Sequence, residues 1–185
     1  SVRGEYELTD ALNLFLKNNK FELIKIEWEF IDIWYPWDIL KANNYFLNKN
    51  EKSEINWEIE PWVYIKWNIV LEKWALLKSG TYIEWNVYIW AWASIWPNTY
   101  LRWNTVIWKE CHIWNAVEIK NSSLWNKTIV AHLSYIWDSI IWNYVNIWGW
   151  MITANLRHDK KNIKVMIKES LIDSWLHKLW IIIWD

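Results

Sequence analysis

Four histidines and one cysteine are the side chains of this chain that suit proton transfer, nucleophilic attack or metal binding near neutral pH. A neutral imidazole accepts a proton in this range, so each histidine is a candidate general base. A lone histidine is nevertheless more often a surface or structural residue. The single cysteine, Cys111, excludes a disulfide framework and a cysteine-based zinc site. The residue types alone therefore leave acid–base chemistry open.

Two cations, Arg102 and Lys120, are 18 residues apart. In a fold that winds in coils of that length, they stack about 4.8 Å apart on one face. Like charges at that distance repel each other unless an anion lies between them, so the pair is a candidate phosphate site. The alternative is a neutral surface ladder, because Glu84 stands in the same column and can pair with Arg102. The spacing alone favours neither interpretation.

A six-residue repeat supplies coils of this length. From residue 59 to residue 119 every sixth residue is Ile or Leu, and the fifth residue of each hexad is small or β-branched. This period is typical of a parallel β-helix in which three hexads make one triangular coil, and we expect two registers to point inward. After a slip of about one residue near Leu124, the pattern resumes as far as Met151. The first register is Ile59, Ile65, Leu71, Leu77, Ile83, Ile89, Ile95, Leu101, Ile107, Ile113 and Ile119; the second is Val63, Ile69, Ala75, Thr81, Val87, Ala93, Thr99, Thr105, Cys111, Val117 and Ser123.

Tryptophan is abundant and glycine scarce. The chain has 22 Trp and 3 Gly, where roughly 13 Gly are usual for this length. Residues 18 apart share a corner of the prism, and there Trp alternates with Gly and Asn, which accept a left-handed backbone. Trp in such a turn costs about 1 to 2 kcal/mol, so ten such sites would cancel the stability of a typical domain. Two columns show the alternation: Trp67, Trp85, Trp103, Asn121 and Trp62, Gly80, Asn98, Ala116.

We expect most of these tryptophans to be glycine in the organism, through UGA codons that some bacteria translate as Gly. The Asn-, Ile- and Lys-rich composition fits an AT-rich genome and thus such recoding. The alternative is an external ladder of stacked indoles, which does not explain the exchange with Gly. The intact mass of the native protein tests the hypothesis, and a mass that matches 22 Trp contradicts it.

The first 50 residues have a different pattern. Apolar spacing predicts a helix before residue 18, a strand over residues 21–26 and a second helix that starts at Pro36. Two helices and a strand bury too little surface to fold alone. The sequence therefore predicts two parts: residues 1–50, the end of a larger α/β domain, and residues 51–185, the β-helix.

Charge and hydropathy exclude several classes of protein. Lys and Arg (20) balance Asp and Glu (21), for a net charge of −1, so bulk charge does not draw the chain to nucleic acid or to an anionic membrane. It has no run of 18 apolar residues that could span a membrane. The opening residues SVRGEYELTD do not form a signal peptide. We expect a cytoplasmic protein that binds neither nucleic acid nor membrane.

Several stretches carry a family resemblance. GEYELTDAL (4–12), FIDIWYPWDILKANNYFL (30–47), AHLSYIWDS (131–139) and VNIWGWMITANLR (145–157) resemble segments of bifunctional sugar-1-phosphate nucleotidylyltransferase/acetyltransferases, the archaeal-type relatives of the bacterial UDP-GlcNAc-making enzyme. The first two resemble the end of the nucleotidylyltransferase domain and the last two the acetyltransferase part. The resemblance implies a mainly β fold, a left-handed parallel β-helix of hexapeptide repeats that is C-terminally incomplete, preceded by the α/β tail of a nucleotidylyltransferase domain.

The family's acetyltransferase chemistry gives several residues a role. The resemblance implies transfer of acetyl from acetyl-CoA to the amine of an amino-sugar 1-phosphate, for nucleotide-sugar synthesis. His132 is the implied general base, because an amine attacks only as the free base. The charged segment 155–168 interrupts the hexads and is either a loop near the coenzyme A phosphates or a solvated loop. The other implied contacts are Arg102 and Lys120 with the phosphate, Tyr135, Asn146 and Asn155 with the sugar, and Lys161 and Lys164 with coenzyme A.

The family's other activity joins a nucleoside triphosphate to a sugar 1-phosphate with the help of Mg²⁺. Glu5 matches a sugar-contacting Glu of that domain, and Asp32 matches an Asp that takes the magnesium. The domain's Gly-rich phosphate loop is not in this sequence, so we expect no nucleotidyl transfer from this piece. The family also continues with further coils that complete the coenzyme A groove, so we do not expect full acetyl transfer from the piece alone.

Two other functions stay open. A γ-type carbonic anhydrase is also a hexad β-helix, but it needs three histidine ligands shared across a subunit boundary, and its closely spaced histidine pair is missing here. A non-catalytic regulatory or assembly β-helix is the other alternative. The family implies a homotrimer, with the site between subunits.

Overall fold

The chain divides into two compact units, Ser1–Ile31 and Asp32–Asp185. The first unit contains helix α1 (Leu8–Leu16), which buries none of its residues. The strand expected over residues 21–26 falls on a stretch in which 21, 23 and 26 lie outside the described residues, and the boundary expected at residue 50 stays a prediction. The computed structural model describes residues 7–17, 19, 20, 22, 24, 25, 27, 29–153 and 156–184.

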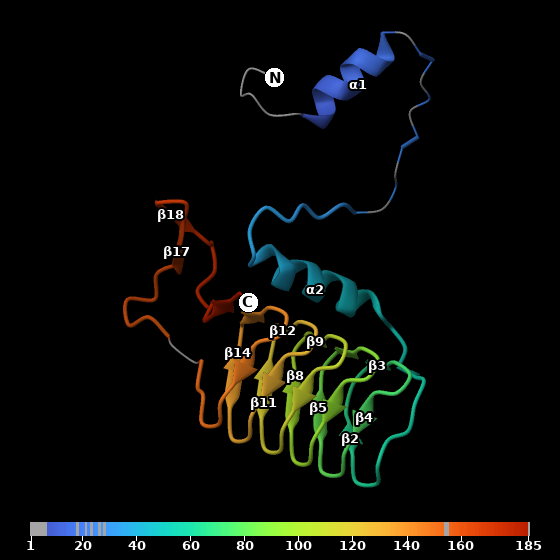
Figure 1. The fold of residues 1–185 in the computed structure, drawn as a ribbon, viewed down its shortest axis with the longest axis vertical. Helices are drawn as coiled ribbons and strands as arrows, with labels where there is room; N and C mark the ends of the chain where they lie inside the picture. Colours follow the sequence, from blue (N-terminus) through green and yellow to red (C-terminus); the bar gives the residue numbers. More distant parts are fainter. Residues whose placement is uncertain are drawn as a thin grey trace. The chain divides into compact units, whose positions relative to one another are not determined.

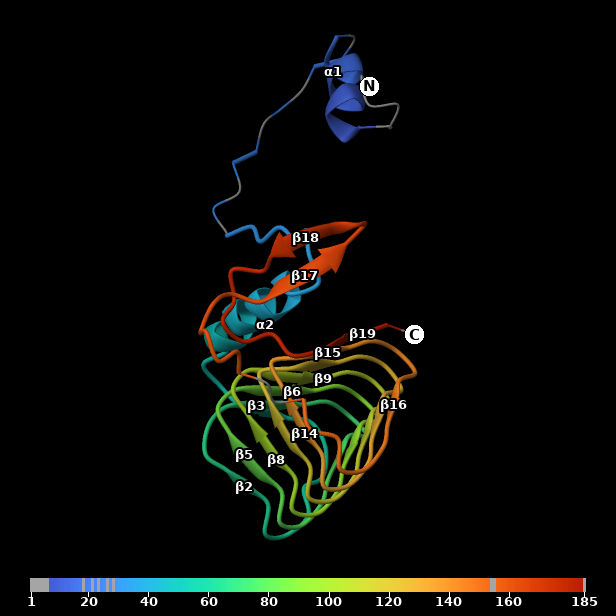
Figure 2. The same ribbon diagram turned by 90° about the vertical axis from the view of Figure 1, so that its left-hand side faces the viewer.

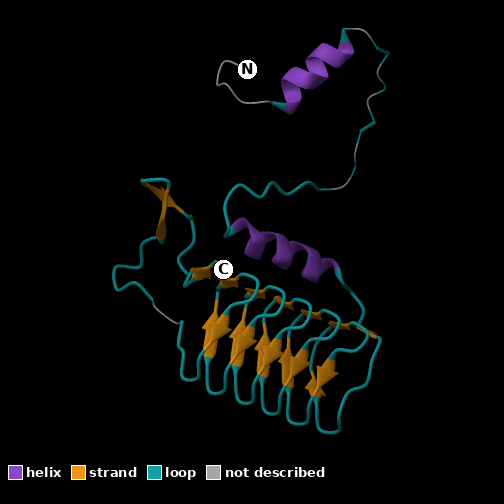
Figure 3. Ribbon diagram, viewed as in Figure 1, coloured by secondary structure: helices purple, strands orange, loops and turns teal. Residues whose placement is uncertain are grey.

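The second unit is a left-handed parallel β-helix, as the hexads and the resemblance predicted (Figure 1). Strands of three sheets, A, B and C, alternate along the chain, and each strand pairs with the strand of the same sheet in the next coil (Figure 3). Sheet A contains β1 (Glu54–Ile55), β3 (Ile69–Leu71), β6 (Val87–Ile89), β9 (Thr105–Ile107), β12 (Ser123–Leu124), β15 (Ile140–Ile141) and β19 (Ile182–Ile183). Sheet B contains β4 (Leu76–Leu77), β7 (Ser94–Ile95), β10 (His112–Ile113), β13 (Ile129–Val130) and β16 (Asn146–Ile147). Sheet C contains β2 (Tyr64–Ile65), β5 (Tyr82–Glu84), β8 (Tyr100–Arg102), β11 (Glu118–Lys120) and β14 (Tyr135–Trp137).

Both predicted inward registers form the core. From Leu71 to Ile119 every residue of the first register is completely buried, and Ile59 and Ile65 are partly buried. The second register is equally buried, and its hydroxyls donate to corner carbonyls, as Thr105 Oγ1 does to the Arg102 oxygen at 2.8 Å. Small residues are needed there because each corner folds closely over them, and a buried hydroxyl must find an acceptor.

The slip in the period lies at one corner. Lys120 pairs with Arg102, 18 residues earlier, whereas Ser123 pairs with Val106, 17 residues earlier. The corner at residues 121–122 is therefore one residue shorter than the corner below it, and the corner at residues 138–139 is equally short. The slip was expected near Leu124 and occurs just before it.

Helix α2 (Asp38–Lys49) lies along this same corner of the coils in both views (Figures 1 and 2). Asp38 fixes the turn before it by accepting the backbone N–H groups of Trp34 at 3.0 Å and Tyr35 at 2.9 Å. Its buried Trp37 and Leu40 pack against the end of the β-helix. The corner asparagines, expected only to fill turns, donate to successive positions of the helix: Asn68 to the Asn50 carbonyl, Asn86 to Asn48 and Asn104 to Asn44.

The segment after residue 155 contains a hairpin that the sequence did not predict. Strands β17 (Lys164–Ile167) and β18 (Ser170–Asp173) pair antiparallel. The two residues between them, Lys168 and Glu169, have φ values of 43° and 64°. Positive φ at both positions is the geometry of the two-residue turn that suits a hairpin. Beyond it, β19 returns to sheet A beside β15.

Left-handed residues recur at all three corners. One column has positive φ at Trp62, Gly80, Asn98 and Ala116, as its alternation predicted. The other columns are Trp74, Trp92, Glu110, Lys127, Tyr144 and Trp85, Trp103, Asn121, Asp138. Trp67, expected at the start of the last column, has no positive φ, so the prediction is wrong at that position. These positions are the ones where glycine is favoured, so the strain argument holds for them.

Other tryptophans lie outside the left-handed region. Trp90, Trp108, Trp125 and Trp142 follow inward residues of sheet A, and their rings stack in a column at centroid distances of 5.0, 4.9 and 4.0 Å. They have the geometry of the alternative, an indole ladder. Backbone strain therefore supports recoding at some tryptophan positions only, and recoding at the others stays a prediction.

Trp62→Gly is expected to raise the free energy of unfolding by about 1 to 2 kcal/mol, because it removes a large side chain from a left-handed backbone. Trp62 has φ 66° and is 88% exposed, so little packing is lost. Urea titration measures the change. Trp148→Gly is the matched control: Trp148 is 81% exposed without positive φ, and its replacement should leave stability unchanged or lower it by about 0.5 to 1 kcal/mol. Equal effects of the two substitutions would contradict the strain argument.

Candidate functional site

Sheet C presents the predicted cation pair on its outer face. Arg102 and Lys120 are direct neighbours on β8 and β11. Arg102 Nη2 forms an ion pair with Glu118 Oε1, from the same strand as Lys120. Of the two interpretations left open by the spacing, the neutral ladder named Glu84 as the partner of Arg102; in the structure Glu84 binds Lys66 Nζ at 2.6 Å and Glu118 takes its place. Among the described residues, Lys120 forms no ion pair.

The side chain of Lys120 is buried instead of reaching into solvent. Lys120 is 3% exposed, and its Nζ lies 3.7 Å from the ring centroid of Trp103 and 3.6 Å from that of Trp137. Burial lowers the pKa of the Lys120 ammonium to about 8; the nearby cations Lys178 and Arg102 contribute, and carboxylates oppose the shift. Lys120 therefore changes its charge close to physiological pH.

Asp138 is the buried acid nearest in the fold to Lys120. It follows β14 at the shortened corner and is 5% exposed. Burial raises the pKa of its carboxyl, while a hydrogen bond from Asn121 and the charge of Lys120 act against that shift. Asn44, Lys120, Asn121, Asp138 and Lys178 line a pocket of about 420 Å³ that α2 helps to form.

His132 lies at the next corner, between sheets B and C. It is exposed and lines a pocket of about 590 Å³ together with Asn146, Gly149 and the rings of Trp114 and Trp148. The pocket is open to solvent and mostly apolar. A neutral imidazole in such a place can take a proton from a bound amine. The structure thus places His132 and Asn146 at the same pocket.

Tyr135 lies between the Arg102–Lys120 pair and the His132 pocket. It begins β14, two residues before the neighbour of Lys120 and three residues after His132. Burial raises the pKa of its hydroxyl, and Glu118 adds to the shift while Arg102 opposes it. Its ring therefore lies within the electrostatic reach of the Arg102–Glu118 pair.

The remaining predicted residues that the structure describes are not brought to this face. Lys161 and Lys164 are exposed and belong to the hairpin segment, which packs beside Tyr35 and α2. Asn155 and Glu5 lie outside the described residues. Asp32 is exposed, and the described ranges hold no group of three His, Cys, Asp or Glu residues that could bind a metal ion. The role of Asp32 in binding magnesium stays a prediction.

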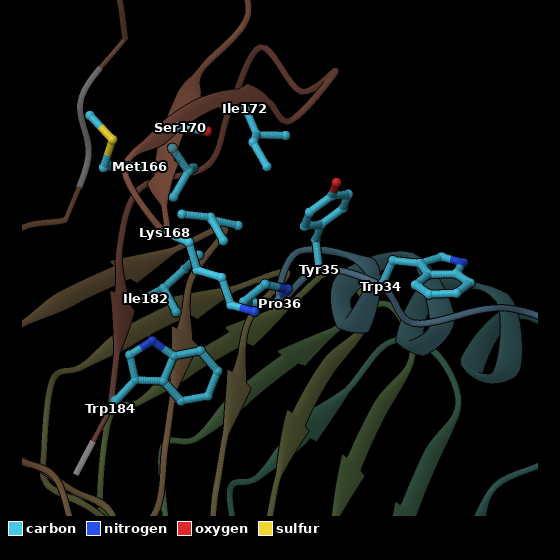
Figure 4. Close-up of a pocket in the computed structure, with 11 residues that line it drawn as sticks. Trp34, Tyr35, Pro36, Met166, Lys168, Ser170, Ile172, Ile182 and Trp184 are labelled. Atoms are coloured by element: carbon cyan, nitrogen blue, oxygen red, sulfur yellow. The ribbon is translucent and has the colours of Figure 1, made fainter. Parts of the chain in front are cut away.

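The structure also contains an apolar groove that the sequence did not predict. It measures about 810 Å³ and lies between Tyr35–Pro36, the hairpin and β19, with Lys168 and Ser170 as its polar members (Figure 4). The sequence pattern that could have indicated the groove is KVMIKESLID (164–173), in which two short apolar runs flank a two-residue turn. The turn residues are Lys and Glu, not the usual Asn-Gly, and this hides the hairpin from turn rules.

Comparison with known proteins shows close relatives over the whole chain. "Bifunctional protein GlmU" of Methanococcus maripaludis strain C7 is 49% identical over 185 residues, which are 100% of this chain and 44% of the relative. The protein of the same name from strain S2 is 44% identical over 185 residues, again 100% and 44%. "Bifunctional sugar-1-phosphate nucleotidylyltransferase/acetyltransferase" of Sulfurisphaera tokodaii is 40% identical over 179 residues, 97% of this chain and 45% of the relative.

The chain spans less than half the length of these relatives. No protein-family model matches it. Within the described part of the chain, no helix is both long enough and apolar enough to cross a membrane.

Gly149→Ala is expected to displace the His132 carbonyl by a few tenths of an ångström and to place a methyl group against the His132 ring, without unfolding the protein. A Cβ at residue 149 would lie 3.2 Å from the His132 carbonyl oxygen and 3.4 Å from Nε2. The His132 Cε1–Hε1 signal in a carbon–proton NMR spectrum should shift, with the unfolding midpoint nearly unchanged.

Gly80→Ala is the contrasting variant. Gly80 has φ +77°, and its added Cβ would meet the Asn98 side chain at 2.3 Å, so stability should fall by about 1 to 2 kcal/mol or more while the His132 signal stays in place. An unmoved His132 signal in Gly149→Ala would contradict the packing described for this pocket.

Proposed function

This chain belongs to the family of bifunctional sugar-1-phosphate nucleotidylyltransferase/acetyltransferases, and from that premise we propose that its β-helix is part of an acetyl-CoA-dependent N-acetyltransferase acting on an amino-sugar 1-phosphate. The observation that carries the proposal is the order of groups around one edge of the β-helix. A cation pair, a tyrosine and an exposed histidine follow one another across sheet C and its corner. An amino-sugar phosphate has a group for each of them: a phosphate for the cations, hydroxyls for the tyrosine and an amine for the histidine.

The phosphate is the group that anchors the substrate in this proposal. Arg102 and Lys120 bind it, and Glu118 holds the guanidinium of Arg102 in place. Tyr135 and Asn146 contact sugar hydroxyls and orient the ring, because hydroxyl and amide groups both donate and accept. Asn155 is proposed for the same role from the resemblance. Binding of the anion leaves the amine at the far end, toward the His132 pocket.

His132 carries the chemistry. The free amine of the sugar attacks the carbonyl carbon of the acetyl thioester, and its N–H proton passes to the His132 imidazole. A C–N bond forms, the C–S bond breaks, and the imidazolium returns the proton to the departing sulfur. The products are the N-acetyl sugar phosphate and the free thiol of coenzyme A. Proton transfer of this kind is worth about 10²- to 10⁴-fold in rate.

The proposal also covers the coenzyme A site, the neighbouring subunits and the family's second activity. Lys161 and Lys164 are proposed to bind the coenzyme A phosphates, and a homotrimer would bring residues of a neighbouring subunit to the site. Nucleotidyl transfer from a nucleoside triphosphate, with Glu5 on the sugar and Mg²⁺ on Asp32, would complete a UDP-GlcNAc-type pathway. The cytoplasmic location stays a prediction.

The proposal is favoured over both alternatives. A γ-type carbonic anhydrase needs three histidine ligands that include a closely spaced pair, and this sequence has no such pair. A non-catalytic β-helix gives no reason for a histidine and a cation pair on the same edge. The relatives are named as bifunctional enzymes with nucleotidylyltransferase and acetyltransferase activity or as GlmU.

His132→Ala in the full-length gene product is expected to lower kcat for acetyl transfer by about 10²- to 10⁴-fold, since it removes the general base. Thiol release from acetyl-CoA, measured with glucosamine 1-phosphate and with galactosamine 1-phosphate, gives the rate and the sugar preference together. Nucleotidyl transfer should be unchanged.

His177→Ala, an exposed histidine outside the pocket, is the control and should retain full activity. Unchanged acetyl transfer in His132→Ala would overturn the role of this residue and favour the non-catalytic alternative.

A further inference from the structure

We propose that the pocket beside helix α2, here called the α2 pocket, receives the part of a substrate that lies beyond its phosphate, so that a nucleoside diphosphate amino sugar is acetylated at the same site as the sugar 1-phosphate. The inference rests on the proposed function, since it takes Arg102 and Lys120 as phosphate ligands and His132 as the base. It adds a substrate class to that function: an amino sugar whose 1-phosphate carries a second phosphate and a nucleoside.

The α2 pocket lies at the end of sheet C opposite to His132. Strand β14 begins three residues after His132, and its last residue is paired with Lys120. Asp138, the next residue along the chain, lines the pocket together with Lys120. A phosphate at the cation pair therefore has the His132 pocket toward one end of the strand and the α2 pocket toward the other. With the amine at His132, a group attached to the phosphate extends toward the α2 pocket.

Two lysines give the α2 pocket an excess of positive charge. The described residues that line it include Lys120 and Lys178 against one carboxylate, Asp138. Lys178 is exposed, and its Nζ lies 4.9 Å from the ring centroid of Trp137. The chain next to it is fixed, because the Trp180 backbone N–H donates to the Asp138 carbonyl at 3.2 Å. Lys178 thus offers an ammonium to the second phosphate of a diphosphate.

The wall between α2 and the corners of the β-helix consists of oriented amides. Asn104 donates to Asn44 Oδ1, and Asn44 Nδ2 donates to Asn121 Oδ1 at 2.9 Å. Asn121 Nδ2 in turn donates to Asp138 Oδ1 at 2.5 Å. Asn104 Oδ1 and Asp138 Oδ2 have no hydrogen-bond partner among the described residues, although both side chains line the pocket and both residues are 5% exposed. Buried acceptors without a donor are rare.

The missing donors and the size of the pocket suit a nucleoside. Ribose hydroxyls and the N–H groups of a base are donors of the kind that these acceptors lack, and side-chain amides bind donors and acceptors alike. The pocket measures about 420 Å³, within the range of about 300 to 1,000 Å³ that is usual for small-molecule sites. Trp85 and Trp103 also line it. The polar groups named above are not tryptophans, so this lining persists where those two positions are glycine in the organism.

The reaction is the proposed acetyl transfer with a larger acceptor. The free amine of the nucleoside diphosphate amino sugar attacks the thioester carbonyl carbon, and its proton passes through His132 to the departing sulfur. The C–N bond forms and the C–S bond breaks. The products are the nucleoside diphosphate N-acetyl amino sugar and the free thiol of coenzyme A. Acetylation can then follow nucleotidyl transfer as well as precede it.

UDP-glucosamine and the full-length enzyme test the proposal. Thiol release from acetyl-CoA is measured in parallel with UDP-glucosamine and with glucosamine 1-phosphate. EDTA is present and pyrophosphate is absent, so that no sugar phosphate is released from the nucleotide, and mass spectrometry identifies the acetylated product. We expect similar kcat values, because the amine meets the same histidine. KM for UDP-glucosamine should be about tenfold lower, because the α2 pocket adds contacts to a charged group.

Lys178→Ala removes the exposed cation of the α2 pocket. KM for UDP-glucosamine should rise about tenfold, while KM for glucosamine 1-phosphate, which does not extend into the pocket, should stay unchanged. Lys109→Ala is the matched control. Lys109 is also exposed, its Nζ lies 5.5 Å from the ring centroid of Trp90, and it does not line the pocket. Its replacement should leave both KM values unchanged.

Other results overturn the inference in distinguishable ways. Acetylation of glucosamine 1-phosphate but not of UDP-glucosamine would contradict the inference and leave the proposed function standing. Equal KM values for the two substrates, or the same change of both in Lys178→Ala, would show that the α2 pocket does not hold the nucleotide part, and the inference would be wrong. A wild-type enzyme that acetylates neither substrate would overturn the proposed function itself.

Discussion

Each coil of the β-helix lies on the next at the spacing of hydrogen-bonded strands, about 4.8 Å, and this constraint governs where every other side chain can be. A residue is surrounded by the residues one coil above and below, so columns and not neighbours in sequence decide its environment. The inward columns accept only aliphatic or small residues because three sheets close around them. The outward columns place charges on charges, and Arg102 and Lys120 meet for this reason.

The corners that break the 18-residue spacing of the coils hold different side chains from the regular corners. Full-length corners present an asparagine to α2, and each asparagine is used to hold the helix. At the two shortened corners the backbone turns one residue sooner, which brings Asn121 under Asp138 and next to Lys120. The deletion that disturbs the hexad pattern therefore places a buried carboxylate, Asp138, on Asn121 beside the helix. A perfectly regular prism would only repeat the contact between a corner asparagine and α2.

The sequence predicts the core, the register and the adjacency of Arg102 and Lys120, because all three follow from one period. It does not predict that Arg102 pairs with Glu118, since that choice depends on side-chain rotamers among several carboxylates in adjoining rows. The bond between Asn44 and Asn121 joins residues 77 positions apart that share no repeat. Asp138 lies within the segment AHLSYIWDS (131–139), but only the structure shows that it is buried at the shortened corner, next to the strand that carries Lys120. His132 and Asn146 were named from resemblance, and the structure brings them to one pocket.

Two of the tryptophans lie against Lys120. As printed, Trp103 and Trp137 enclose the Lys120 ammonium, and each cation–π contact is worth about 0.5 to 2 kcal/mol. Trp103 also has positive φ, so its corner is one where glycine is favoured. Glycine at both positions would remove both rings from the ammonium and open space on its two faces. The space left by the rings would be where an anionic ligand reaches the ammonium. At Trp103 the backbone constraint that favours glycine and the access that such a ligand needs point to the same substitution, whereas Trp137 has no positive φ and is not under that constraint.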